Sequence, residues 1–122
     1  MTQVELDNLV SYWQGMLRLR DWDVKINLVR GRDLDQNTGG NCEWVLKRRT
    51  ALIKILDPID YPPEIQWPQD IEETIVHELL HLHFAPFDHT TDDADDIARE
   101  QAISMIASGF VGLRRSSATS KL

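Results

Sequence analysis

Two histidines four residues apart, with a glutamate directly after the first, stand inside an apolar stretch of this chain. The segment from His77 to His81 reads His-Glu-Leu-Leu-His. On an α-helix, positions i and i+4 lie above one another on the same face, so both imidazole rings point to the same side. Two rings placed in this way can bind one metal ion at the ~2.0–2.1 Å of a zinc–nitrogen bond. The spacing therefore predicts a helix with a metal-binding face.

The residues around this segment predict a buried helix. Asp70 is a candidate N-cap, and Glu73 follows three residues later in an acidic variant of the capping box. No Gly or Pro interrupts residues 71–84, and Pro86 limits the helix at its C-terminal end. Apolar side chains surround most of this helix: Ile75, Val76, Leu79, Leu80, Leu82 and Phe84. Because unpaired polar groups inside a protein are costly, the histidines and the glutamate there need partners, and a metal ion provides one.

Glu78 is the candidate catalytic residue. It lies three residues before His81, close enough to the metal-binding face to reach a metal-bound water molecule without binding the metal. A carboxylate in this place can take a proton from the water and later pass it to a leaving amine. The pattern HExxH is the zinc-binding and catalytic signature of metallopeptidases, so His77 and His81 are predicted zinc ligands.

A catalytic zinc ion usually has three protein ligands, and Glu100 is the candidate for the third. It stands nineteen residues after His81, within a helix expected from about residue 92 to 109 or 110. If that helix packs across the HExxH helix, it can present Glu100 to the metal. Other acidic or imidazole side chains near the start of this helix are alternatives: Asp88, His89, Asp92, Asp93 and Asp96.

Other polar residues near the motif have predicted supporting roles. His83 points to the opposite side of the helix from the motif, so we expect a hydrogen-bonded structural histidine there. Glu73 lies one turn before His77 and is a candidate for orienting its ring, with helix capping as the equal alternative. His89 and Tyr61, in the segments that flank the helix, are candidates for stabilising an oxyanion, although packing among prolines is the alternative for Tyr61.

The chain before the motif predicts one helix and three strands. Helically spaced apolar residues, with a capping box at the start, indicate a helix over about residues 2–19. Alternating polar and apolar residues over 22–28 indicate a strand, and residues 42–46 and 50–56 indicate two more. Three residues of the last strand are expected to face the core: Ala51, Ile53 and Ile55.

The order of these elements predicts an α+β fold. An N-terminal helix, a small three-stranded and mostly antiparallel sheet, the HExxH helix and a following ligand-bearing helix account for one domain over residues 1–111. Residues 112–122 are rich in Ser, Thr and basic residues and are expected to form a flexible tail.

Composition narrows the classes of function. The net charge of −7 argues against nonspecific binding to nucleic acid or to anionic membranes. No apolar run approaches the ~20 residues that span a bilayer, and no secretory signal pattern opens the chain. Cys42 is the single cysteine, so an intrachain disulfide is impossible, and without a CxxC pattern it is not a candidate zinc ligand. We expect a cytoplasmic protein whose partner is a peptide or protein substrate.

The HExxH motif followed by Glu100-Gln101 resembles the gluzincin branch of zinc metallopeptidases, in which a glutamate on the following helix is the third ligand. More narrowly, the chain is similar to small metallopeptidases encoded by bacteriophages and prophages, which would act in the host cytoplasm. Beside the HExxH motif, three short segments carry this likeness: Asp21-Trp22, Ala85-Pro86 and Arg99-Glu100-Gln101. The metzincin pattern fails, because Phe87 stands where that class has a third histidine.

The resemblance implies a minimal zincin-like metallopeptidase domain with Zn²⁺ on His77, His81 and Glu100. Such a domain would hydrolyse peptide bonds with a zinc-bound water activated by Glu78. Zincin-like folds bind an extended peptide along an edge strand, here residues 42–46 or 50–56. The alternatives are a non-catalytic zinc-binding interaction module of phage origin and a metal-free scaffold with an accidental motif.

Overall fold

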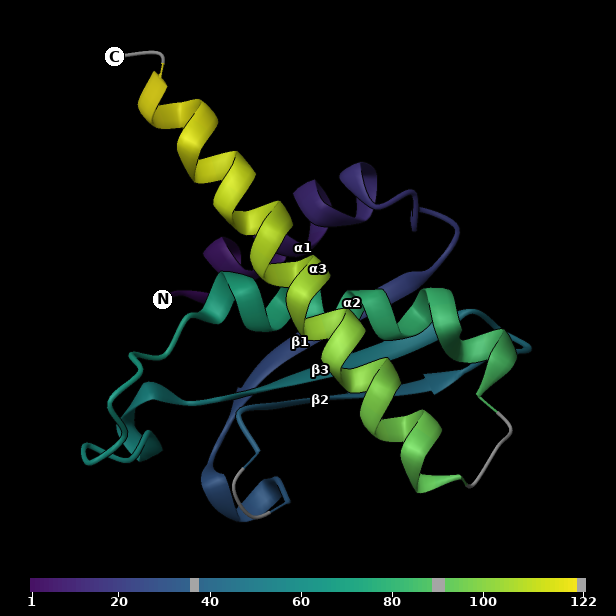
Figure 1. Cartoon of the computed structure of the whole chain (residues 1–122), viewed down its shortest axis with the longest axis horizontal. Helices are drawn as coiled ribbons and strands as arrows, with labels where there is room; N and C mark the ends of the chain where they lie inside the picture. The colour runs from purple at the N-terminus through teal and green to yellow at the C-terminus, as the bar shows by residue number, and fades with distance from the viewer. Residues whose placement is uncertain (36–37, 89–91, 121–122) are drawn as a thin grey trace.

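The computed structural model of the chain describes residues 1–35, 38–88 and 92–120. Three α-helices and one three-stranded sheet form this part of the molecule, which confirms the predicted α+β class (Figure 1). The helices are α1 (Gln3–Met16), α2 (Ile71–Phe84) and α3 (Asp93–Ser120). None of the helices in the described ranges is both long and apolar enough to cross a membrane.

The sheet consists of β1 (Asp23–Val29), β2 (Gly40–Val45) and β3 (Thr50–Leu56) in the order β1-β3-β2. β2 and β3 form an antiparallel hairpin, whereas β1 pairs with β3 in parallel. The sheet is therefore mixed, with one pair of each kind, and not mostly antiparallel. Alternation of side chains indicates where strands lie but not which strands pair. The long connection between β1 and β2, which includes a 3-10 turn at Gly31–Asp33, lets the chain pass to the other side of β3.

The core lies between one face of the sheet and the helices. The predicted inward residues of β3 are all buried, with Ile53 and Ile55 fully inaccessible to solvent. α2 lies over this face and contacts β2, β3, α1 and α3, which explains why it is apolar around most of its circumference. The helices contribute these buried residues to one cluster: Leu6, Val10 and Trp13; Ile75, Val76, Leu79 and Leu82; Ile103, Ala107 and Val111.

The caps predicted from the sequence are present at the first two helices. Thr2 Oγ1 accepts a hydrogen bond from the Glu5 backbone N–H at 3.2 Å, and Asp70 Oδ1 accepts one from the Glu73 N–H at 3.1 Å. With this cap at one end and Pro86 shortly beyond the other, α2 has the bounds that the sequence predicts.

α3 is longer than predicted. Where the sequence suggests a flexible tail over 112–122, the helix continues through Gly112 to Ser120. Val111, one turn beyond the buried Ala107, is itself buried against the core, so the helix has a packed face past its predicted end. Tertiary contact therefore overrides the weak helix propensity of the glycine and serine residues in this segment.

Two arginines also fix the C-terminal half of α3 to the start of α2. Arg114 forms an ion pair with Glu72 and lies over the ring of Tyr12, 4.0 Å from its centroid. Arg115 makes two hydrogen bonds to Asp70, at 2.7 and 3.0 Å. These contacts join residues more than forty positions apart in the chain, which is why the local sequence does not reveal them.

Candidate metal centre

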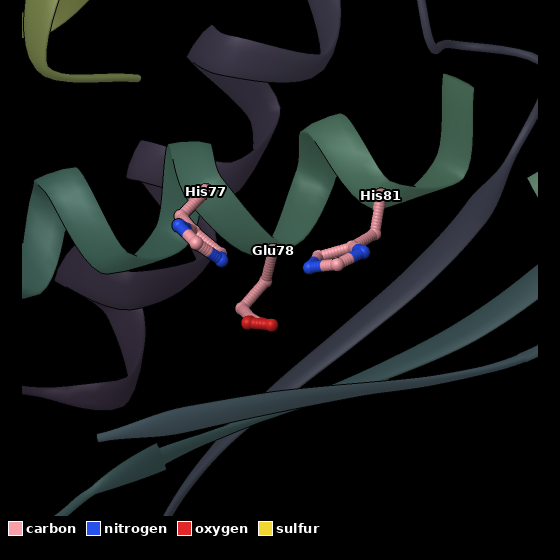
Figure 2. Close-up of side chains that lie close together, drawn as sticks. All are labelled: His77, Glu78 and His81. Atoms are coloured by element: carbon pink, nitrogen blue, oxygen red, sulfur yellow. The ribbon is translucent and has the colours of Figure 1, made fainter. Parts of the chain in front are cut away.

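His77, Glu78 and His81 form a compact cluster on the face of α2 that is turned toward the sheet. Figure 2 shows the two imidazole rings projecting from the same side of the helix, with the Glu78 side chain between them and directed toward the strands. The ring centroids lie 5.2 Å apart, and one donor atom from each of the three residues lies within 4.8 Å of the others. This is the arrangement that the HExxH spacing predicts.

Glu100 reaches the same place from α3. Its Oε2 atom lies 3.0 Å from His77 Nε2, and its Oε1 atom lies 2.7 Å from His81 Nε2. The carboxylate therefore joins the two rings. Packing of α2 against the buried face of α3 holds the two helices together and brings Glu100 to the histidines. The structure thus places all four predicted site residues together.

The donors fit a zinc ion in chemical type. Two imidazoles and one carboxylate are a known donor set of catalytic zinc, which leaves one position open. Each Glu100 oxygen lies closer to one Nε2 atom, at 3.0 and 2.7 Å, than the about 3.4 Å that separates ligands bound tetrahedrally at about 2.1 Å. Without metal, each Nε2–H can donate to the carboxylate, and metal binding replaces those protons.

Ser104 is a part of this centre that sequence analysis missed. Its Oγ lies 3.3 Å from His77 Nδ1, the ring nitrogen that faces away from Glu100. Ser104 stands one helical turn after Glu100, so one face of α3 contacts both nitrogens of His77. The spacing of four residues from Glu100 was the one feature of the sequence that could have indicated Ser104 as a neighbour of His77. Within the described ranges, Glu73, the candidate for orienting His77, makes no hydrogen bond to that ring, and its backbone N–H donates to the Asp70 cap.

Burial controls the protonation of the centre. Glu78 is 6% exposed, and its burial, together with the charge of Glu100, raises the pKa of Glu78 to about 8. A divalent cation beside the carboxylate acts in the opposite direction, so metal binding favours the ionised form that can accept a proton. Burial also lowers the pKa of His81 below its ordinary value of 6.5, which favours the neutral imidazole that metals bind.

Two residues of β2 border the centre. The ring of Trp44 is stacked with that of His81, with centroids 6.4 Å apart. Burial is the main cause that raises the pKa of the Cys42 thiol to about 12, with Glu78 and Glu43 adding to the shift.

The candidate metal centre lies where two clefts meet. A smaller cleft of about 450 Å³ runs along β2 and a larger one of about 770 Å³ lies beside the start of α2. His77, Glu78 and Glu100 line both.

Most alternative metal ligands have other partners. Asp88 and Asp96 line the smaller cleft, but their carboxylates contact Arg99 at 3.4 and 2.9 Å. Asp92 accepts a hydrogen bond from the Ala94 backbone at 2.9 Å. Asp93 is exposed at the start of α3 and lines neither cleft. Among the alternatives in the described ranges, none approaches the two histidines as Glu100 does.

The remaining predicted roles have mixed outcomes. His83 Nε2 lies 2.6 Å from the Leu17 carbonyl oxygen, which confirms a hydrogen-bonded structural histidine. Tyr61 lines the larger cleft, but its hydroxyl donates to the Trp67 carbonyl at 2.5 Å and is therefore engaged. His89, a candidate both as a ligand and for the oxyanion, lies outside the described residues.

Comparison with protein families, curated proteins and solved structures gives no match to this chain. The resemblance to gluzincins therefore depends on the motif residues alone. The chemistry of the metal centre is the basis on which a function can be argued.

Proposed function

We propose that this chain is a zinc-dependent metallopeptidase. The observation that carries the proposal is the convergence of two imidazoles from α2 and one carboxylate from α3, at 2.7 and 3.0 Å, directly beside a buried glutamate. His77, His81 and Glu100 would hold the ion, and Glu78 would act on the water that attacks the peptide carbonyl. A pair of histidines with only a structural role would not need the buried Glu78 carboxylate beside it.

The residues of the centre divide the work of hydrolysis. A zinc ion held there supplies Lewis acidity to a water molecule and to the substrate carbonyl. Glu78 accepts the proton that the water loses and then donates it to the leaving amine. Its carboxylate is directed away from α2 toward the strands, where the substrate would lie (Figure 2). Ser104 holds His77 by its second nitrogen and keeps the ring in the orientation that leaves Nε2 for the metal.

β2 is the strand we propose as the binding edge for an extended peptide. The sequence left two strands as candidates for the peptide-binding edge, residues 42–46 and 50–56. The second of these is β3, the central strand, and both of its edges are paired. Among the described strands, β2 is paired along one edge only, and it lines the smaller cleft with Gly40, Cys42 and Trp44. A peptide added beside this edge would pass the metal centre with its main chain hydrogen-bonded to β2.

Zinc content and the variant Glu78→Gln test the proposal together. We expect one equivalent of zinc in protein purified without a polyhistidine tag, and cleavage of a casein or mixed-peptide substrate. Glu78→Gln should retain zinc and lose cleavage by at least about 100-fold, the range for removal of a general base. Glu64→Gln, which changes an exposed carboxylate that lines neither cleft, is the matched control. Full activity in Glu78→Gln would refute the mechanism.

The same measurements separate the two alternatives. Stoichiometric zinc without any cleavage that depends on Glu78 would favour a non-catalytic zinc-binding module. Protein that contains no zinc, or whose zinc affinity is unchanged by His81→Ala, would mean that the HExxH motif is accidental.

A further inference from the structure

Both clefts beside the proposed metal centre have acidic linings, but they differ in their basic residues. In the smaller one, Arg99 contacts Asp88 and Asp96. The larger one has no Lys or Arg in its lining, as far as the structure describes it. Its acidic lining residues are Asp35, Asp60, Asp70, Glu73, Glu78 and Glu100. A peptide that passes the metal centre would therefore have one flank in a strongly acidic environment.

Several of these carboxylates already have partners. Asp60 forms two hydrogen bonds with Arg30, at 2.8 and 3.0 Å, and Asp70 forms two with Arg115. Two others belong to the metal centre. The charges of these four are thus compensated by the protein or would be compensated by the metal ion.

Glu73 is different. Its backbone N–H is used in the Asp70 cap, but its carboxylate has no hydrogen-bond or ion-pair partner within the described ranges. It is half-buried on α2, one helical turn before His77, which places the two Cβ atoms about 5–6 Å apart. Asp35 is also without a partner there, but it is exposed. Glu73 is therefore the negative charge in this cleft that lies near the reaction centre and that a ligand can neutralise.

The rest of the larger cleft suits a long side chain. Apolar and aromatic residues from β3, the proline-rich segment and α3 line it: Leu56, Tyr61, Pro62, Ile65, Pro68 and Ala107. Lysine and arginine place their methylene groups along such surfaces while the charged end reaches a polar partner. A volume of about 770 Å³ accommodates either side chain.

We propose that the larger cleft binds a lysine or arginine side chain of the substrate next to the scissile bond, and that Glu73 determines this specificity. The inference rests on the proposed peptidase function and adds the class of substrate to it. Coulomb attraction to the Glu73 carboxylate selects the cation, and the apolar wall holds the methylene groups. The preferred substrates are therefore basic peptides.

Fluorogenic peptides that differ at one flanking position test this specificity. Lys, Arg, Leu and Glu would be placed in turn on either side of the scissile bond, and kcat/KM measured with zinc-loaded protein. We expect the Lys and Arg peptides to be cleaved at least about tenfold more efficiently than the Leu peptide on one side, and the Glu peptide to be the poorest. Glu73→Gln should remove this preference without loss of zinc, with Glu64→Gln as control.

Each other outcome has a defined meaning. Cleavage of all peptides at similar rates, or a basic preference that survives in Glu73→Gln, overturns the specificity proposal and leaves the peptidase intact. If no peptide is cleaved although zinc is bound, the peptidase proposal fails. Fluorescence anisotropy with labelled Lys and Leu peptides then decides on the cleft: tighter binding of the Lys peptide, lost in Glu73→Gln, supports it, and equal binding refutes it.

Discussion

α2 and α3 both contribute side chains to the proposed metal centre, but they are held in different ways. α2 is buried on most sides, and its histidines are spaced by the geometry of a single helix. α3 buries only one stripe and exposes large apolar side chains such as Met105 and Leu113. The position of Glu100 therefore depends on how α3 packs, whereas the positions of His77 and His81 relative to each other depend on local structure alone.

The largest expected effect concerns packing. Leu79→Ala on α2 should lower the free energy of unfolding by about 2–5 kcal/mol, because it leaves a cavity at a fully buried position. Leu113→Ala on α3 makes the same chemical change at a side chain that is 68% exposed. It should change the free energy of unfolding by less than about 0.5 kcal/mol. Urea unfolding of both variants measures the contrast. Similar losses in the two variants would mean that α3 is packed as tightly as α2.

Zinc affinity tests whether both helices bind the ion. We expect His81→Ala and Glu100→Ala each to weaken zinc binding by more than about 100-fold, because each removes one of three protein ligands. Competition with a chromogenic chelator measures this. Asp93→Ala, at the exposed start of α3, is the control and should bind zinc normally. Normal affinity in Glu100→Ala would place the third ligand elsewhere.

Ser104 allows a finer test of the contribution of α3. Ser104→Ala removes the partner of His77 Nδ1 and should weaken zinc binding by about 10–100-fold, the range for residues that orient a ligand. Ser104→Thr keeps a hydroxyl and should restore most of the affinity. Ser108→Ala, an exposed serine on the same helix, should have no effect. If the alanine and threonine variants bind zinc alike, the hydroxyl does not orient His77.

The smallest effect concerns the ion pair that fixes α3 to the start of α2. Arg115 holds the pKa of Asp70 below its ordinary value of 3.8. A depressed folded-state pKa gives stability that is present above pH 3.8 and is lost as the pH falls through the lower folded value. Arg115→Gln should therefore cost less than about 1 kcal/mol at pH 7, since Arg115 is 54% exposed.

Unfolding experiments at several pH values check that the stabilisation by the Arg115–Asp70 pair is lost as the pH falls. The difference between Arg115→Gln and the unchanged protein should shrink below pH 3.8. Arg48→Gln, in the exposed turn between β2 and β3, serves as control. A difference that grows on acidification would contradict the assignment of the pair.

Local signals were sufficient for several elements. The Asp70 cap and the position of Pro86 defined α2 correctly, and the alternation of residues 50–56 defined β3 and its inward side chains. These features depend on residues within a few positions of one another. The parallel pairing of β1 with β3 was not predictable in this way, because a strand pattern carries no information about its neighbour.

The length of α3 and the position of Ser104 also depend on contacts that local sequence patterns do not reveal. Gly112 and the serines after it suggest that the helix ends, but Arg114 and Arg115 find their partners at the start of α2. Ser104 becomes part of the metal centre only because α3 crosses α2 with this face inward. Neither contact has a local signal strong enough to predict it.

The sequence by itself determined that two histidines and a glutamate would share a side of one buried helix, because helix geometry fixes residues four apart. Only the tertiary structure decided that Glu100 and Ser104 meet His77, that β2 and not β3 is an edge strand, and that an acidic cleft with Glu73 adjoins this cluster. Those relations join segments distant in the chain, and they depend on how helices and strands pack around the shared core.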